Sequence, residues 1–111
     1  MAGRIEIGCY RPKPGMEAAF ISLMKKEAPL LREEGYLTDY PVTILRSPED
    51  GAWIQIAQWT SEDAADRAHE NERVMAHWDR LAKTTEYLSM SELIKAGDEF
   101  PEFEYYPDFF D

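Results

Sequence analysis

The residues of this chain that could do chemistry gather in one predicted helix, between residues 60 and 83. Asn71, His77 and Trp78 all lie in this segment. Amide and indole N–H groups can hydrogen-bond a developing oxyanion, and an imidazole can exchange a proton near neutral pH. Helical spacing places Asn71 and Trp78 on the apolar face of the helix, with His77 off that face. We therefore take these three as candidate catalytic residues, with His77 as an acid or a base and Asn71 able to face a ligand carbonyl.

The same residues also have structural uses. Asn71 could bond the helix backbone near the segment 70–72 instead of a ligand carbonyl. His69 and His77 could be solvated side chains on the side or surface of the helix. They stand eight residues apart, too far for a compact His-x-x-x-His pair, and Cys9 is the only cysteine. No metal site is therefore predicted.

Three further aromatic residues are candidates for binding a substrate. Trp53 and Trp59 belong to one predicted strand, and Tyr10 belongs to another. Together with Trp78 they could line an aromatic pocket for a small molecule. Core and interface packing is the commoner use of tryptophan in a small domain, so both uses stay open.

Regular strands and helices must position these side chains. Apolar residues alternate at period two in the strands and recur every three or four residues in the helices. Pro29 predicts a kink or a fresh short helix, and Thr60 with Asp63 predicts an N-cap. In order, the predicted elements are a strand at 4–10, a helix at 16–34, a hairpin of strands at 38–46 and 52–59, a helix at 60–83 with a break near 70–72, and a strand at 85–94.

This βαββαβ order predicts an α+β fold of the ferredoxin-like kind. Its four-stranded antiparallel sheet would carry both helices on one face. The strand at 52–59 has apolar residues on both faces, with Ile54 and Ile56 on one and Trp53 on the other. Since the helices cover only one face, a second copy of the chain is expected to cover the other, in a homodimer. Pro41 favours an edge position for the strand at 38–46.

A polar cluster is also possible on this sheet. Glu6 and Tyr10 share a strand face, and Gln55 could lie beside them on a neighbouring strand. The cluster would belong either to the dimer interface or to a functional site. Cys9, by contrast, alternates with Ile5 and Ile7 and is expected to be a small core residue.

The end of the chain differs in composition from the rest. We divide the sequence into a ferredoxin-fold domain at 1–96 and an acidic, aromatic tail at 97–111. The tail holds six acidic and six aromatic residues and no base. Disordered tails are usually poor in aromatic residues, so this one is expected to pack on the dimer, with Phe103 and Tyr105 facing inward.

Charge narrows the range of partners. The 111 residues include 22 acidic and 12 basic ones, a net charge of −10. Such a chain repels phosphate, so neither nucleic acid nor an anionic membrane surface is an expected partner. There is no long apolar run and no signal-peptide pattern, so a cytoplasmic location is expected.

Three segments resemble a known family. They are the turn at 11–15, the strand that ends in Trp59 and runs into the helix start at 60–65, and the stretch 71–81 with its His and Trp. Over about residues 4–94 the chain resembles the dimeric α/β-barrel superfamily, and within it the antibiotic-biosynthesis-monooxygenase-like domains. This resemblance implies a homodimer of face-to-face sheets, with a small-molecule pocket between sheet and helices in each subunit.

The resemblance also implies a choice of functions. Some relatives oxidise aromatic polyketides with O₂ and without metal or flavin, which would require no cofactor here and would use Trp59, Asn71 and Trp78 around the substrate. The alternative is a binding or structural homodimer without chemistry. Haem-degrading relatives need an Asn in strand one and a His ligand in helix two. Here Gly8 occupies the first place and His77 lies near the second, so haem is the less favoured ligand.

Overall fold

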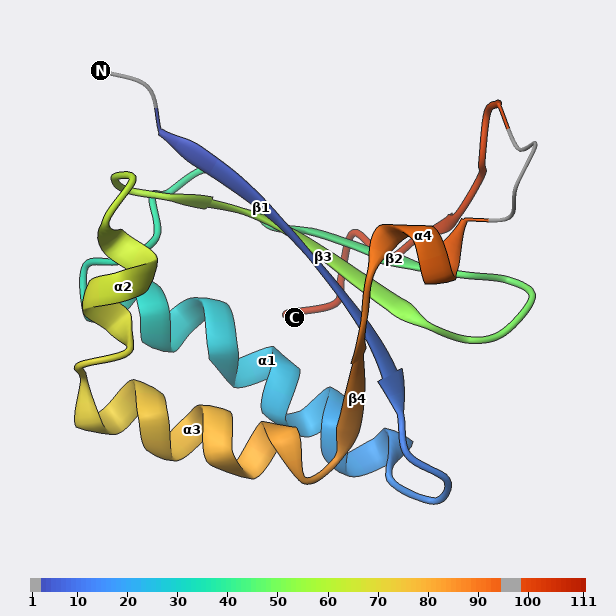
Figure 1. The fold of residues 1–111 in the computed structure, drawn as a ribbon, viewed down its shortest axis with the longest axis horizontal. Coiled ribbons are helices and arrows are strands. Elements are labelled where there is room, and N and C mark those ends of the chain that lie inside the picture. The colour runs from blue at the N-terminus through green and yellow to red at the C-terminus, as the bar shows by residue number, and fades with distance from the viewer. Residues whose placement is uncertain (1–2, 95–98) are drawn as a thin grey trace.

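The computed structural model describes residues 3–94 and 99–111. The boundary predicted at 96–97 and the first two residues of the tail lie outside the described residues. The elements run in the order β1 (Arg4–Pro12), α1 (Glu17–Glu33), β2 (Thr43–Arg46), β3 (Trp53–Trp59), α2 (Ala64–Ala68), α3 (Glu72–Ala82), β4 (Thr85–Leu88), α4 (Met90–Leu93) and β5 (Glu104–Tyr105) (Figure 1).

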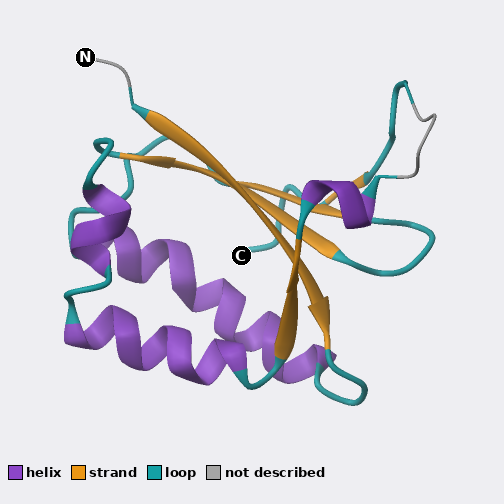
Figure 2. Ribbon diagram, viewed as in Figure 1, coloured by secondary structure: helices purple, strands orange, loops and turns teal. Residues whose placement is uncertain are grey.

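The predicted ferredoxin-like fold is confirmed, with one strand more than expected. The antiparallel sheet has the order β4-β1-β3-β2-β5. Helices α1, α2 and α3 lie together on one side of it (Figure 2). The register pairs Tyr10 with Trp53 and Gly8 with Gln55, so these residues share the sheet face that looks toward the helices.

Strand β2 is shorter and less peripheral than predicted. It begins at Thr43 rather than at residue 38, and residues 38–42 form no strand, although Leu37, just before them, makes an isolated bridge to Trp59. Pro41 lacks the N–H that a continuous ladder would need. The edge position was also wrong, because β5 pairs with β2 at Leu45 and Arg46.

Strand β4 ends earlier than predicted, at Leu88. A short helix, α4, takes the place of the second half of the expected strand. Ser89 starts it with a capping box, in which its hydroxyl accepts from the Glu92 N–H and the Glu92 carboxylate accepts from the Ser89 N–H. This local pair of hydrogen bonds favours a helix start over an extended chain.

The long helices depart from prediction in two details. Helix α1 continues through Pro29 as one element, and Pro29 is exposed, so the carbonyl that loses its N–H partner can reach water. The second predicted helix is divided into α2 and α3, and the expected break near 70–72 is confirmed. Thr60 does not cap α2. Its hydroxyl donates instead to the carbonyls of Gly35 and Tyr36.

The described part of the tail packs on its own subunit. Phe109 is buried and joins a core cluster with Tyr10, Phe20 and Trp53, and the Tyr106 N–H donates to the Ile44 carbonyl at 3.0 Å. Of the two residues predicted to face inward, Phe103 is half-buried, but Tyr105 is 63% exposed. The β5 pairing turns Tyr105 outward and leaves the residues after it to reach the core. Packing of the tail on a partner subunit stays a prediction.

The outer face of the sheet is only partly covered within one chain. Cys9 is buried there, as predicted, with its Sγ atom 3.7 Å from the Met90 Sδ atom of α4. Ile5 and Ile7 are 56% and 45% exposed. Among the described residues, therefore, no element packs over this part of the outer face, although its apolar residues predict that it is buried. None of the described helices has the length and apolar character that a membrane span requires.

Candidate functional site

A cavity of about 480 Å³ lies between the inner face of the sheet and the helices. This volume is within the range of small-molecule sites. Its walls come from β1, β3 and β4 on one side and from α1, α2 and α3 on the other. Much of the lining is aromatic or aliphatic, and includes Tyr10, Leu31, Trp59, Trp78, Leu81 and Leu88.

A buried carboxyl group lies in the wall of this cavity. Glu27 of α1 is only 4% exposed. Its Oε2 atom accepts a hydrogen bond from the Gln55 amide at 2.9 Å, and its Oε1 atom accepts one from the Trp78 indole N–H at 2.9 Å. Three elements thus converge on one carboxyl group: α1, β3 and α3.

The surroundings of Glu27 change its acidity. Burial disfavours the charged form and raises the pKa of the carboxyl group, and the nearby charge of Glu6 adds to this. The hydrogen bonds from Gln55 and Trp78 act in the opposite direction but are outweighed. A carboxyl group with a raised pKa is suited to exchanging protons near neutral pH.

Two other polar atoms of the cavity-lining residues are buried without a hydrogen-bond partner in the described structure. They are the Gln55 Oε1 atom and the Trp59 Nε1 atom. Buried polar groups are nearly always hydrogen-bonded in proteins, so unpaired ones need an explanation. One acceptor and one donor are thus left unpaired in residues that line the same cavity.

Tyr10 lies over Gly8 in the sheet. A Cβ atom added at Gly8 would be 2.6 Å from the Tyr10 hydroxyl oxygen, so the phenol occupies the space that a side chain at position 8 would need. Tyr10 is buried, and burial, with the charges of Glu27 and Glu6, raises its pKa well above the usual 10. Its hydroxyl group therefore remains protonated and able to donate a hydrogen bond.

These residues do not fit haem. Position 8 has no room for an amide side chain while Tyr10 stays in place. His77 does not line the cavity; it lines a separate groove with residues of α1 and α3. Within residues 3–94 and 99–111, no group of three His, Cys, Asp or Glu side chains is placed to hold a metal ion.

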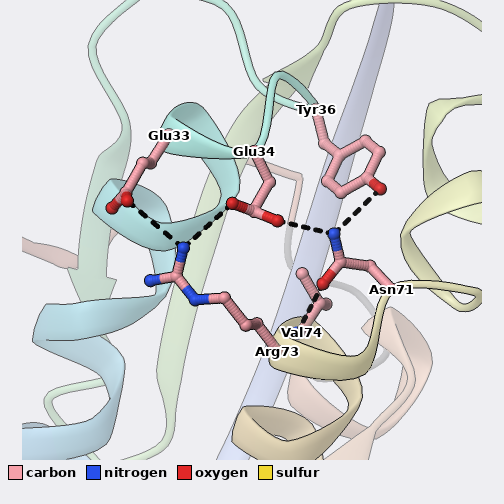
Figure 3. A network of polar contacts seen from close by, with 6 residues as sticks. All are labelled: Glu33, Glu34, Tyr36, Asn71, Arg73 and Val74. Atoms are coloured by element: carbon pink, nitrogen blue, oxygen red, sulfur yellow. Dashed lines mark hydrogen bonds and ion pairs between the residues drawn. The ribbon is translucent and has the colours of Figure 1, made fainter.

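Asn71 is engaged away from the cavity, in a network that joins α1 to α3 (Figure 3). Its Oδ1 atom accepts from the Val74 N–H and caps α3, while its Nδ2 atom donates to Glu34 at 2.7 Å and to the Tyr36 hydroxyl at 3.2 Å. Arg73 adds ion pairs to Glu33 and Glu34. Asn71 is not among the residues that line the cavity. Its structural use, the bond to the helix backbone, is the one observed.

The other predicted residues are divided between the cavity and its surroundings. Trp59, Trp78 and Tyr10 line the cavity, whereas Trp53 packs against Tyr106 and Phe109 of the tail. His69 and His77 were both predicted to lie on the side or surface of the helix. The prediction is correct for His69 and wrong for His77. His69 is exposed and lies against Trp78, with ring centroids 4.7 Å apart.

His77 is 3% exposed, because it lies at the contact of α1 with α3. Its Nε2 atom is 3.8 Å from the Glu27 Oε1 atom. Burial and the positive charges of Arg80 and Lys26 lower the pKa of its imidazole.

Sequence reasoning missed Glu27 as a candidate functional residue, although its position was visible. Glu27 falls on the apolar stripe of the helix at 16–34, between Met24 and Leu31. A carboxyl group on a buried stripe needs hydrogen-bond partners. That signal could have marked Glu27 as a functional candidate, but its partners Gln55 and Trp78 are far away in sequence.

Comparison with known proteins identifies the family. The model of a family described as antibiotic biosynthesis monooxygenase matches residues 4–88. No curated protein matches the chain. Among solved structures, the chain is similar to SnoaB, a cofactor-independent oxygenase from Streptomyces nogalater, with a TM-score of 0.64 and 23% identity over 78% of this chain and 88% of that one. At this identity the likeness to SnoaB shows the fold alone. From the match over 4–88, the chain belongs to the antibiotic biosynthesis monooxygenase family.

Proposed function

We propose that this protein is a cofactor-independent oxygenase that acts on a small aromatic, polyketide-like compound. The observation that carries the proposal is the buried Glu27 carboxyl group in the wall of an otherwise largely apolar cavity, held by Gln55 and Trp78. Membership of the antibiotic biosynthesis monooxygenase family supports the same reaction class, to which SnoaB also belongs.

The cavity would orient the substrate through its aromatic walls. A flat ring system can pack against Trp59, Trp78 and Tyr10, in offset or edge-to-face contacts. The unpaired Trp59 N–H and Gln55 carbonyl would then bond polar substituents of the ring. The protonated hydroxyl of Tyr10 would be a further donor for the oxyanion that forms on deprotonation.

Glu27 would act as the base. Its carboxylate removes a proton from an acidic methylene group of the substrate, and the resulting carbanion adds to O₂ to form a peroxide. Loss of water from the peroxide leaves a carbonyl group. One oxygen atom enters the product and the other becomes water, so the substrate supplies all the electrons and no external reductant is needed.

We further propose that the working unit is a homodimer. Ile5 and Ile7 remain exposed on the outer face of the sheet, beside the half-buried Ile56. Their burial against the same face of a second copy would remove apolar surface from water, at about 25 cal/mol per Å². A two-fold arrangement lets one patch serve both subunits.

The activity test is oxygen uptake with phenolic polycyclic compounds that carry an acidic methylene group, in the presence of a chelator and without flavin. We expect one O₂ per carbonyl formed. Glu27→Gln should lower kcat about a hundredfold or more, as the loss of a general base usually does. Glu17→Gln is the matched control, since Glu17 lies on the same helix but is exposed and paired with Arg46.

Two results would count against this proposal. If the wild-type protein binds these compounds but consumes no O₂, the protein is a non-catalytic binding dimer. Equal rates for wild type and Glu27→Gln would remove Glu27 from the mechanism.

A further inference from the structure

A second titratable residue lies directly behind Glu27. The Nε2 atom of His77 is 3.8 Å from the Glu27 Oε1 atom, and both side chains are buried. Glu27 lines the cavity, whereas His77 lines a groove on α1 and α3. The pair therefore spans the helix layer, with the carboxyl group on the cavity side and the imidazole behind it.

The two groups that hydrogen-bond Glu27 are donors, so neither can accept a proton from its carboxyl group, whereas His77 can. Both carboxyl oxygens accept from N–H donors, Gln55 on Oε2 and Trp78 on Oε1. These donors stabilise the ionised carboxylate. The His77 Nε2 atom is buried and has no hydrogen-bond partner in the described structure. It is thus unpaired and 3.8 Å from Oε1, so a small side-chain adjustment would bring the two atoms within hydrogen-bonding distance.

The charges on each side favour a pair that holds a single proton. On the cavity side, Glu6 of β1 disfavours a second negative charge at Glu27. On the groove side, Lys26 of α1 and Arg80 of α3 disfavour a positive charge at His77, and Lys25, Glu33 and Arg73 line the same groove. Burial acts against both charges. These effects favour the neutral pair, in which Glu27 carries the proton. The ion pair contains the same number of protons and differs only in having the proton on His77.

We propose that His77 is a positioning residue that accepts the proton of the Glu27 carboxyl group. Glu27 thereby becomes a carboxylate that can act as a base. The proton moves from Glu27 Oε1 to His77 Nε2, and a carboxylate and an imidazolium form without any exchange with solvent. The carboxylate then accepts the substrate's proton and returns it to the departing oxygen as water forms. When the imidazolium gives its proton back, the pair returns to its resting form. This inference rests on the proposed role of Glu27 as a base.

The direct test is an NMR pH titration of the two histidines in the ligand-free protein. In the wild type, the His77 ring nitrogens should respond in two steps, since two interacting groups lose their protons in two steps that both residues sense. In Glu27→Gln they should respond in one step, with the step at higher pH lost. The Glu17→Gln variant is the control, and its His77 curves should follow those of the wild type, since Glu17 is exposed and paired with Arg46.

A kinetic test measures whether the pair matters for the reaction. His77→Gln keeps a polar side chain beside Glu27 but cannot take its proton. We expect kcat to fall about tenfold, with KM unchanged and the acid limb of the pH–rate profile displaced. A purely packing role for His77 would leave that limb where it is.

The outcomes separate this inference from the proposed function. His77 curves that superimpose in wild type and Glu27→Gln would overturn the pairing, whether or not the protein consumes O₂. An unchanged pH–rate profile in a folded His77→Gln variant would overturn the role of His77 in the reaction. Absence of oxygen uptake in the wild type would count against the oxygenase alone, and the NMR titration would still decide whether the two residues share a proton.

Discussion

The packing of the C-terminal tail on its own subunit can be tested by removing one ring. Phe109 is 8% exposed and lies 5.6 Å from the Trp53 ring and 5.2 Å from the Phe110 ring, measured between centroids. Truncation of a buried Phe to Ala usually costs about 3–5 kcal/mol. Because the half-buried rings of Tyr106 and Phe110 can collapse into part of the space, we expect Phe109→Ala to cost about 3 kcal/mol.

The tail also contains its own control. Phe100 is 87% exposed, so the same truncation there removes little buried surface and should change stability by less than about 0.5 kcal/mol. Urea unfolding at matched protein concentration would give both free energies, and the melting temperature of Phe109→Ala should fall by about 10–20 °C. Equal stability of the two variants would refute the packing of the tail on the body of the subunit.

Three other predictions concern the carboxyl group, the dimer and haem. The pKa of Glu27 is raised in the folded state, so its contribution to stability is complete below the ordinary carboxyl pKa and is lost as pH rises through the raised value. Glu27→Gln should therefore gain stability relative to wild type as pH rises in urea titrations, and a constant difference would contradict the raised pKa. Ile7→Glu should convert the dimer to a monomer in sedimentation experiments, whereas Ser22→Glu on exposed α1 surface should not; a wild-type monomer at micromolar concentration would exclude the interface. Titration with haemin should give no saturable Soret shift, and a shift abolished by His77→Ala would show that haem binds after all.

Most of the fold could be predicted from the sequence because its signals are local. The alternation in β1 and β3, the helical stripe of α1 and the turn residues between them each extend over a few neighbouring residues. The break between α2 and α3 was visible for the same reason. The errors at β2 and β4 have local causes as well, namely Pro41 and the capping box of Ser89 with Glu92. These were read as parts of longer strands because both segments are rich in strand-forming residues.

The candidate site was only partly predictable. Trp59, Trp78 and Tyr10 were identified as cavity residues because aromatic side chains on inward-facing positions have few other places to go. Asn71 was selected for its chemistry, but its side-chain amide is used in three hydrogen bonds, two of them to Glu34 and Tyr36, more than 30 residues away in sequence. No local pattern could have shown that these partners exist.

The sequence by itself determined the order of the elements from β1 to β4, the inner and outer faces of the sheet, and a carboxyl group at position 27 on the buried stripe of the first helix. Only the tertiary structure decided what that carboxyl group meets. Gln55 comes from β3, and Trp78 and His77 come from α3. The packing of α1 against α3 and the sheet brings these groups within a few ångströms of one another. The physical reason is that backbone periodicity sets which way a side chain points, whereas burial, hydrogen bonding and pKa depend on residues that are distant in sequence and adjacent only after folding.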